Sequence, residues 1–170
     1  MASRLYEYKL DQQTIWWTAI HIVAIIFGGI AIFGLYLGGL FSAWFCLFVL
    51  AFVLLMVLSI PRTISLTDRR LTINSVLDVT SIEIKDIVSA KKVSPRKIRW
   101  IFPIFASCGF FGHYGYFFDF RSRRVLAIYI THWRYLIEIV DKDDNYYYIS
   151  SHQRDELIEE LSIKALAVTA

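Results

Sequence analysis

IWWTAIHIVAIIFGGIAIFGLYL at residues 15–37 and LFSAWFCLFVLAFVLLMVLSI at residues 40–60 form most of a 46-residue run without a single Asp, Glu, Lys or Arg. A hydrocarbon core about 30 Å thick needs roughly 20 helical residues at about 1.5 Å each, and each half supplies that number. Gly38 and Gly39 separate the halves. The run therefore predicts a two-helix transmembrane hairpin over residues 15–60, preceded by a segment of residues 1–14 and followed by a domain of residues 61–170.

Positive charges at the ends of the hairpin predict its orientation, because cytoplasmic flanks of membrane helices carry an excess of Lys and Arg. The connecting turn has no Lys or Arg. Five of these residues lie close to the outer ends of the two helices: Arg4, Lys9, Arg62, Arg69 and Arg70. Both termini are therefore expected on the cytoplasmic side. The first apolar run is longer than the roughly 7 to 15 residues of a cleaved signal, so the first helix is expected to stay in the protein.

Small residues recur at about four-residue spacing in the first helix, at Ala24, Gly28, Gly34 and Gly38. Small side chains let helix backbones approach closely in lipid. These residues either pack against the second helix or dock onto another membrane protein, and the spacing alone allows both.

His21 is the one titratable side chain expected inside the bilayer. Ionisable groups at that depth are candidates for function. A haem held by two imidazoles would need a second ligand, which the hairpin lacks. A neutral, hydrogen-bonded histidine or a contact between subunits is the expected role.

After Pro61 the apolar pattern changes from continuous to alternating, which is typical of strands with one wet face. Strands are predicted at residues 62–66, 71–76, 80–84, 87–93, 116–120, 125–130, 135–140 and 146–149. Residues 94–115 are expected to form a long loop. A C-terminal amphipathic helix follows, with Leu157, Ile158 and Leu161 on one face. This order predicts a mainly-β sandwich or barrel capped by a C-terminal helix.

Three short segments narrow the fold further. They are PRTISLTDRRLTI at residues 61–73, GFFGHYGYF at residues 109–117 and YISSHQRDEL at residues 148–157. Together, behind two membrane helices, they resemble the bacterial pleckstrin-homology-like (PH-like) membrane proteins. The resemblance implies a PH-like domain on the cytoplasmic side of a bacterial inner membrane, and it implies no catalytic residues.

The charge of the predicted domain is uneven. Residues 85–134 contain ten Lys or Arg and only two acids, whereas residues 138–160 contain eight acids and two bases. Cations mixed with aromatic side chains suit a lipid headgroup interface. The candidate contacts to lipid or to a partner protein are Arg96, Lys97, Arg99, Trp100, Arg121, Arg123 and Arg124. A basic face that is merely solvated is the remaining alternative.

Signals for chemistry are absent from the sequence. Gly109, Gly112 and Gly115 precede a strand rather than a helix, unlike a dinucleotide-binding loop. His113, His132 and His152 lack metal-ligand spacing, and Cys46 and Cys108 are expected to be free thiols. We therefore expect no metal, cofactor, small-molecule substrate or nucleic-acid partner. The predicted function is a non-enzymatic interaction or accessory subunit of a larger inner-membrane assembly, with binding of anionic lipid headgroups as the alternative.

Overall fold

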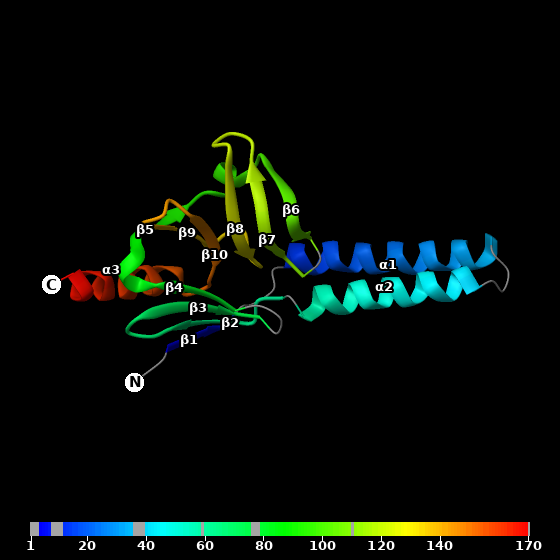
Figure 1. Cartoon of the computed structure of the whole chain (residues 1–170), viewed down its shortest axis with the longest axis horizontal. Coiled ribbons are helices and arrows are strands. Elements are labelled where there is room, and N and C mark those ends of the chain that lie inside the picture. Colours follow the sequence, from blue (N-terminus) through cyan, green and yellow to red (C-terminus); the bar gives the residue numbers. More distant parts are fainter. Residues whose placement is uncertain are drawn as a thin grey trace.

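A computed structural model describes residues 4–7, 12–35, 40–58, 60–75, 79–109 and 111–169. Two apolar helices, α1 (Gln12–Leu35) and α2 (Leu40–Leu58), extend side by side from a β-rich head (Figure 1). The 23 residues 12–34 of α1 are long enough to cross a membrane; their most apolar window has a mean hydropathy of 2.1, and only 6% of that window is buried within the molecule. The comparable stretch of α2, Ala43–Leu55, is shorter than a span needs. Gly38 lies outside the described residues.

The first sheet of the head has four antiparallel strands in the order β1-β2-β3-β4. They are β1 (Arg4–Glu7), β2 (Thr63–Leu66), β3 (Arg70–Asn74) and β4 (Val79–Glu83). β1 precedes the helices and pairs with β2, which follows them. The sequence did not indicate this strand, and it makes part of the N-terminal segment an edge of the head.

The second sheet has six strands in the order β5-β9-β10-β8-β7-β6. They are β5 (Ile87–Val93), β6 (Ile101–Cys108), β7 (His113–Asp119), β8 (Arg124–Ile130), β9 (Leu136–Asp141) and β10 (Tyr146–Ser150). β5 pairs directly with β9, so the three strands β6 to β8 are inserted in the sequence between two paired strands. This insertion, the β6–β8 meander, joins the sheet through the parallel pair β8–β10.

Residues 94–115 are not one long loop as the sequence predicted. They contain a 3-10 turn, η2 (Pro95–Ile98), and all of β6, which pairs with β7 despite containing Pro103. The register shifts between Pro103 and Phe105, and β6 is the edge strand of its sheet. Pro is tolerated at edges and bulges because no ladder hydrogen bond is lost there.

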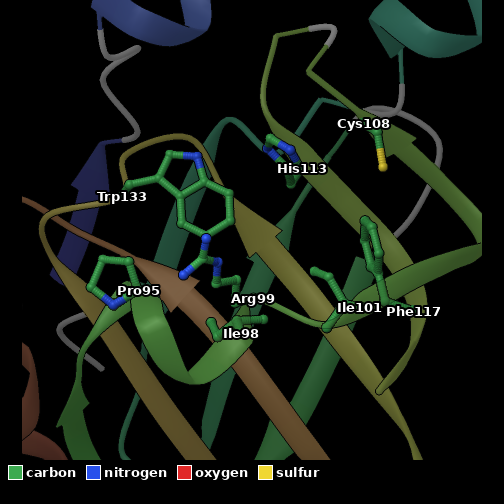
Figure 2. A pocket seen from close by; sticks show the side chains of 8 residues that line it. All are labelled: Pro95, Ile98, Arg99, Ile101, Cys108, His113, Phe117 and Trp133. Atoms are coloured by element: carbon green, nitrogen blue, oxygen red, sulfur yellow. The ribbon is translucent and has the colours of Figure 1, made fainter. Parts of the chain in front are cut away.

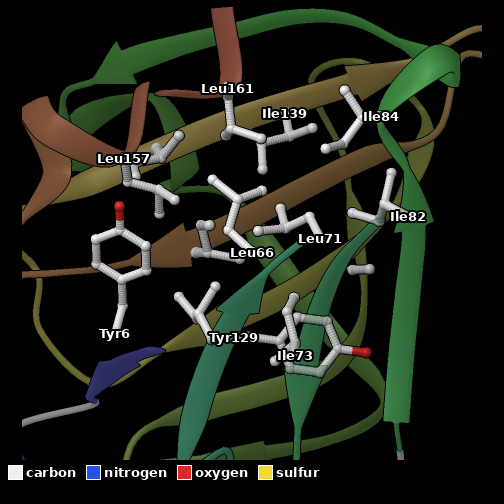
Figure 3. Close-up of a cluster of buried hydrophobic side chains, with 14 of the residues drawn as sticks. Tyr6, Leu66, Leu71, Ile73, Ile82, Ile84, Tyr129, Ile139, Leu157 and Leu161 are labelled. Carbon is white, nitrogen blue, oxygen red and sulfur yellow. The ribbon is translucent and has the colours of Figure 1, made fainter. Parts of the chain in front are cut away.

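The main core lies between the two sheets and is closed by α3 (Arg154–Thr169). Leu157 and Leu161 of α3 meet Leu66, Leu71 and Ile139 from the sheets (Figure 3). This confirms the expected mainly-β domain with a C-terminal helix that covers its core. A second cluster lies on the other face of the six-stranded sheet, where Ile98 of η2 covers Phe117 and Ile128.

Candidate functional site

The first two turns of α1 are hydrogen-bonded to the head. The hydroxyl of Thr14 donates to the carbonyl of Thr131 at 3.1 Å. The hydroxyl of Thr18 accepts from the amide of Phe111 at 2.8 Å and lies 3.4 Å from the carbonyl of Gly109. Both threonines are buried. The turn between β6 and β7 is therefore fixed against the start of α1, and we call this contact the helix–head junction.

His21 lies at the edge of this junction. Its Nδ1 is 2.7 Å from the carbonyl oxygen of Trp17, and because a carbonyl can only accept, Nδ1 carries the proton. A Cβ added at Gly109 would lie 3.5 Å from the His21 ring. His21 is thus a hydrogen-bonded side chain beside the β6–β7 turn, which agrees with one of the two roles expected from the sequence.

A pocket of about 340 Å³ opens beside the junction (Figure 2). Ile98 of η2 and Phe117 of β7 are buried in its floor. The other lining residues are Pro95, Arg99, Ile101, Cys108, His113 and Trp133. Cys108 and His113 flank the β6–β7 turn, and Trp133 follows Thr131 by two residues, so three lining residues belong to segments that touch α1.

His113 is the polar group of this pocket that the fold leaves unsatisfied. Its Nδ1 is buried and has no hydrogen-bond partner among the described residues. The ring packs edge-on against Trp133 at a centroid distance of 4.9 Å. Burial lowers the pKa of His113, so the imidazole is neutral at pH 7 and can donate or accept one hydrogen bond at Nδ1, depending on its tautomer.

Cys108 pairs across the β6–β7 ladder with His113, which raises the question of a cysteine nucleophile. Burial raises the pKa of the Cys108 thiol. Reactive cysteines have a lowered pKa, because the thiolate is the nucleophile. The arrangement therefore lacks the electrostatics of a cysteine–histidine catalytic pair.

Lys97, one of the predicted contact residues, is engaged inside the protein. Its ammonium group binds Oε2 of Glu138, a side chain with no exposed surface, and Tyr148 donates to the same oxygen at 2.6 Å. Lys91 lies 3.0 Å from Oε1. Burial alone would raise the pKa of Glu138, but the hydrogen bonds from Lys97, Tyr148 and Lys91 outweigh it and lower the pKa. Lys97 thus holds η2 onto the sheet.

Arg124 is also paired within the molecule. Its guanidinium lies 2.5 Å from Asp144, 2.9 Å from the hydroxyl of Tyr146 and over the ring of that tyrosine. This contact ties β8 to the turn between β9 and β10.

The other predicted cations, Arg96, Arg99, Arg121 and Arg123, are exposed and have no ion pair to any described residue. They come from two segments that the fold brings together, since the amide of Phe120 donates to the carbonyl of Trp100 at 3.1 Å. Asp119 shapes the second segment by accepting from the amides of Arg121 and Ser122. Four unpaired arginines therefore lie near one end of the β6–β8 meander.

Exposed apolar side chains lie on the same part of the head. Phe102, Ile104 and Phe105 of β6 are 58%, 58% and 84% exposed, and Trp100 and Phe120 are exposed beside them. Phe102 and Phe120 stack edge-on at 6.3 Å. We call these five residues the apolar strip. β6 lies on the side of the head from which the helices extend (Figure 1). The sequence pattern signalled these apolar residues but not their strand.

The small residues of α1 do not pack against α2. The residues of α1 that line the groove between the helices are Ile25, Ile26, Gly29, Ile30 and Phe33. At about 100° per residue, Ala24, Gly28 and Gly34 lie about 110° to 170° around the helix from the centre of that face. A Cβ added at Gly28 or Gly34 would have nothing within 4 Å. Among the described residues, Gly28 and Gly34 therefore do not contact α2, whereas Gly29 lies on the groove side, and docking of the small residues onto another membrane protein stays a prediction.

The two helices also leave a wide apolar groove between them. It measures about 520 Å³ and is lined on the α2 side by Phe45, Cys46, Val49, Leu50 and Val53. Cys46 and Cys108 are both free, as expected. The helix pair thus has incomplete internal packing.

Comparison of the chain with protein-family models, with curated proteins and with solved structures finds no match. The description of function therefore depends on the chain's own geometry. Among the described residues, no group of three His, Cys, Asp or Glu side chains could hold a metal ion.

Proposed function

We propose that this chain is a membrane-anchored, non-enzymatic PH-like module that acts as an interaction or accessory subunit of a larger assembly in a bacterial inner membrane. In this proposal α1 and α2 form a transmembrane hairpin, and both termini and the head lie in the cytoplasm. The observation that carries the proposal is the small-residue face of α1, which points away from α2 and has open space over Gly28 and Gly34.

The physical basis is the way in which helices associate in lipid. Lipid tails are as apolar as the helices, so association depends on close backbone approach and van der Waals packing at small residues. No described residue of this chain covers that face at Gly28 or Gly34, because α2 lies on the other side of α1. The groove between α1 and α2 offers a second surface for an additional helix. Both features fit a hairpin that completes its packing within a larger complex.

The head supports the PH-like assignment through its architecture. Two mainly antiparallel layers enclose one core, and a C-terminal helix covers that core with Leu157 and Leu161. The segments that carry the sequence resemblance, residues 61–73 and 148–157, form β2, β3 and the passage from β10 into α3. Burial raises the pKa of the Cys108 thiol, so this cysteine is a poor nucleophile. A head without a reactive cysteine at this position is consistent with a binding role rather than a catalytic one.

The experiment is purification of the full chain in mild detergent with measurement of mass, comparing two neighbouring glycine variants. Gly28→Leu fills the outward face, and Gly29→Leu adds the same volume on the groove side, where an added Cβ also has open space. We expect species heavier than the 19.8 kDa chain for the wild type and for Gly29→Leu, and their loss for Gly28→Leu. A lone monomer in every mild detergent would contradict the proposal, as would equal losses for both variants.

Binding of anionic lipid by the head is the second candidate function. The favouring observation is that the four exposed arginines adjoin Trp100 and Phe120 of the exposed apolar strip. Each basic residue near an anionic leaflet contributes about 1 kcal/mol. Hydrogen exchange of β6 in nanodiscs should slow when phosphatidylcholine is partly replaced by phosphatidylglycerol, and high salt should reverse the effect. Exchange that is independent of lipid charge would exclude this candidate.

A further inference from the structure

We infer that the pocket between η2 and the β6–β7 turn binds the phosphodiester headgroup of an anionic phospholipid from the leaflet in which α1 begins. The inference relies on the proposed membrane anchoring and assigns a site to the lipid-binding candidate. Its basis is the position of the pocket, its apolar wall and Arg99, the one cation among its lining residues.

The position of the pocket follows from the helix–head junction. Thr14 and Thr18 are inside the head, so the part of α1 free to cross lipid is residues 19–35, about 25 Å long at about 1.5 Å per residue. That length is close to the hydrocarbon thickness of about 30 Å. Trp16 and Trp17 are exposed at the level where this part begins, as in the aromatic belts of membrane proteins. The headgroup layer therefore lies at the level of Thr18 and of the β6–β7 turn bound to it.

One side of the pocket lies at that level, because three of its eight lining residues belong to segments that contact α1, and η2 forms the other side. Cys108 and His113 stand at the two ends of the β6–β7 turn, and Trp133 follows the carbonyl that accepts from Thr14. A headgroup beside α1 can therefore reach the pocket without its acyl chains leaving the bilayer. A volume of about 340 Å³ is within the range of small-molecule sites.

The chemistry of the lining matches a phosphodiester on an apolar stem. Arg99 supplies a positive charge that no described acid neutralises, and guanidinium groups bind phosphate oxygens through paired hydrogen bonds. The ring of His113 lines the pocket, but its Nδ1 is buried, so Arg99 is the group that contacts the phosphate. Ile98, Ile101 and Phe117 provide an apolar wall for the glycerol and first methylene groups.

Lys97 explains why Arg99 is available for this role. The pairing of Lys97 with buried Glu138 fixes η2 over the sheet, and Ile98 is anchored in the second core cluster. The neighbouring side chain of Arg99 then lines the pocket, whereas Arg96 on the same turn does not. Arg96 and Arg99 are both exposed and lie three residues apart, but only Arg99 lines the pocket. They therefore provide a matched pair for experiment.

The experiment measures alkylation of Cys108 by uncharged N-ethylmaleimide in the full chain, one chain per nanodisc. Cys46→Ser leaves Cys108 as the only thiol. Discs of phosphatidylcholine are compared with discs in which phosphatidylglycerol is increased stepwise. We expect phosphatidylglycerol to slow alkylation, and Arg99→Gln to raise the fraction needed for half-protection about fivefold, the effect of about 1 kcal/mol. Arg96→Gln should leave the half-protection point nearly unchanged, and Arg99→Lys should restore most of the protection.

Three results would overturn the inference. The first is equal alkylation in neutral and anionic discs. The second is an equal shift for Arg96→Gln and Arg99→Gln, which would assign the effect to general surface charge. The third is full protection by inorganic phosphate in phosphatidylcholine discs, which would assign the pocket to a free anion. Single chains in discs have no protein partner, so these results are independent of the assembly proposed above.

Discussion

The part of the head closed by α3 and the β6–β8 meander share one sheet but treat their apolar side chains in opposite ways. In the closed part, Leu66, Leu71 and Leu157 are fully buried. In the meander, Phe102 and Phe105 of the edge strand are largely exposed. The main core contains Tyr114, Ala127 and Tyr129 of the meander but no described residue of β6. Contiguous exposed apolar surface of this kind indicates a contact outside the chain.

The charged side chains of the two regions differ in the same direction. In the closed part, Arg4 bridges Glu156 and Glu160 between β1 and α3, and Lys164 of α3 pairs with Asp68. Around the meander, Arg96, Arg99, Arg121 and Arg123 form no ion pair with a described acid, although Arg121 interacts electrostatically with Asp119. The closed part thus pairs several of its charges across elements, whereas the cations of η2 and of the β7–β8 turn stay exposed.

The largest expected effect tests whether the two regions differ in their contribution to stability. Leu157→Ala should lower the free energy of unfolding by about 2 to 5 kcal/mol, because it leaves a cavity in the main core. Phe105→Ala in the strip should change it by less than about 0.5 kcal/mol. Denaturant unfolding of the full chain in mild detergent measures both. Similar losses for the two variants would remove the distinction between the regions.

The next effect concerns the turn that joins the meander to α1. Gly112 has a φ of 132°, and an added Cβ would lie 2.6 Å from the carbonyl oxygen of Ile130. Gly112→Ala should therefore destabilise the protein by about 2 kcal/mol. Gly34→Ala, where nothing lies within 4 Å, is the control and should be close to neutral. A neutral result for Gly112→Ala would show that the turn adapts freely.

A smaller effect separates internal pairing from free charge. Glu138→Gln should lower the free energy of unfolding by roughly 1 to 2 kcal/mol at neutral pH, because Lys91 and Lys97 lose their carboxylate partner. The pKa of Glu138 is lowered from its ordinary value of 4.5, so its contribution is present above about pH 4.5 and is lost as pH falls through the lowered pKa. Wild type and variant should therefore converge in acid, as followed by unfolding at a series of pH values.

Exposed Glu159 provides the control for this titration. Glu159→Gln should leave the unfolding free energy nearly unchanged at every pH, because surface carboxylates contribute little. If the Glu138→Gln difference persisted undiminished in acid, the buried carboxylate would not be the group responsible.

The smallest effect addresses the helix–head junction itself. Thr18→Val keeps the shape of the side chain but removes its hydrogen bonds with the amide of Phe111 and with the carbonyls of Thr14 and Gly109. Loss of about 1 kcal/mol should speed amide exchange of the β6–β7 turn about fivefold, measured by mass spectrometry. Ile20→Val, at an exposed position of α1, should leave that exchange unchanged. An unchanged rate in Thr18→Val would mean that other contacts hold the turn.

Local patterns predicted much of this architecture. The uncharged run of residues 15–60 gave both helices, and alternation gave β2 to β5 and β7 to β10 within a few residues. The spacing of Leu157 and Leu161 identified the face of α3 that enters the core. Each of these features depends on neighbours in the sequence, which is the information that periodicity contains.

The features missed by the sequence analysis depend on distant partners. β1 has only four residues and is a strand because β2, almost 60 residues later, pairs with it. β6 lacks alternation and contains Pro103, so only its pairing with β7 defines it. The roles of Lys97 and Arg99 also diverge through tertiary contacts, since one meets Glu138 and the other faces a pocket. Four of the predicted cations remain available, whereas Lys97 and Arg124 are engaged.

Both helices are connected closely to the head. Thr14 and Thr18 bind α1 directly, and the four residues after α2 lead into β2, with the amide of Arg62 donating to Asn74 at 2.8 Å. Two such attachments resist swivelling of the head about the helix axes. Under the proposed membrane anchoring, a thinner bilayer or a neighbouring helix that tilts the pair would turn the whole head through a similar angle, which makes the orientation of the head a mechanical readout of events within the lipid.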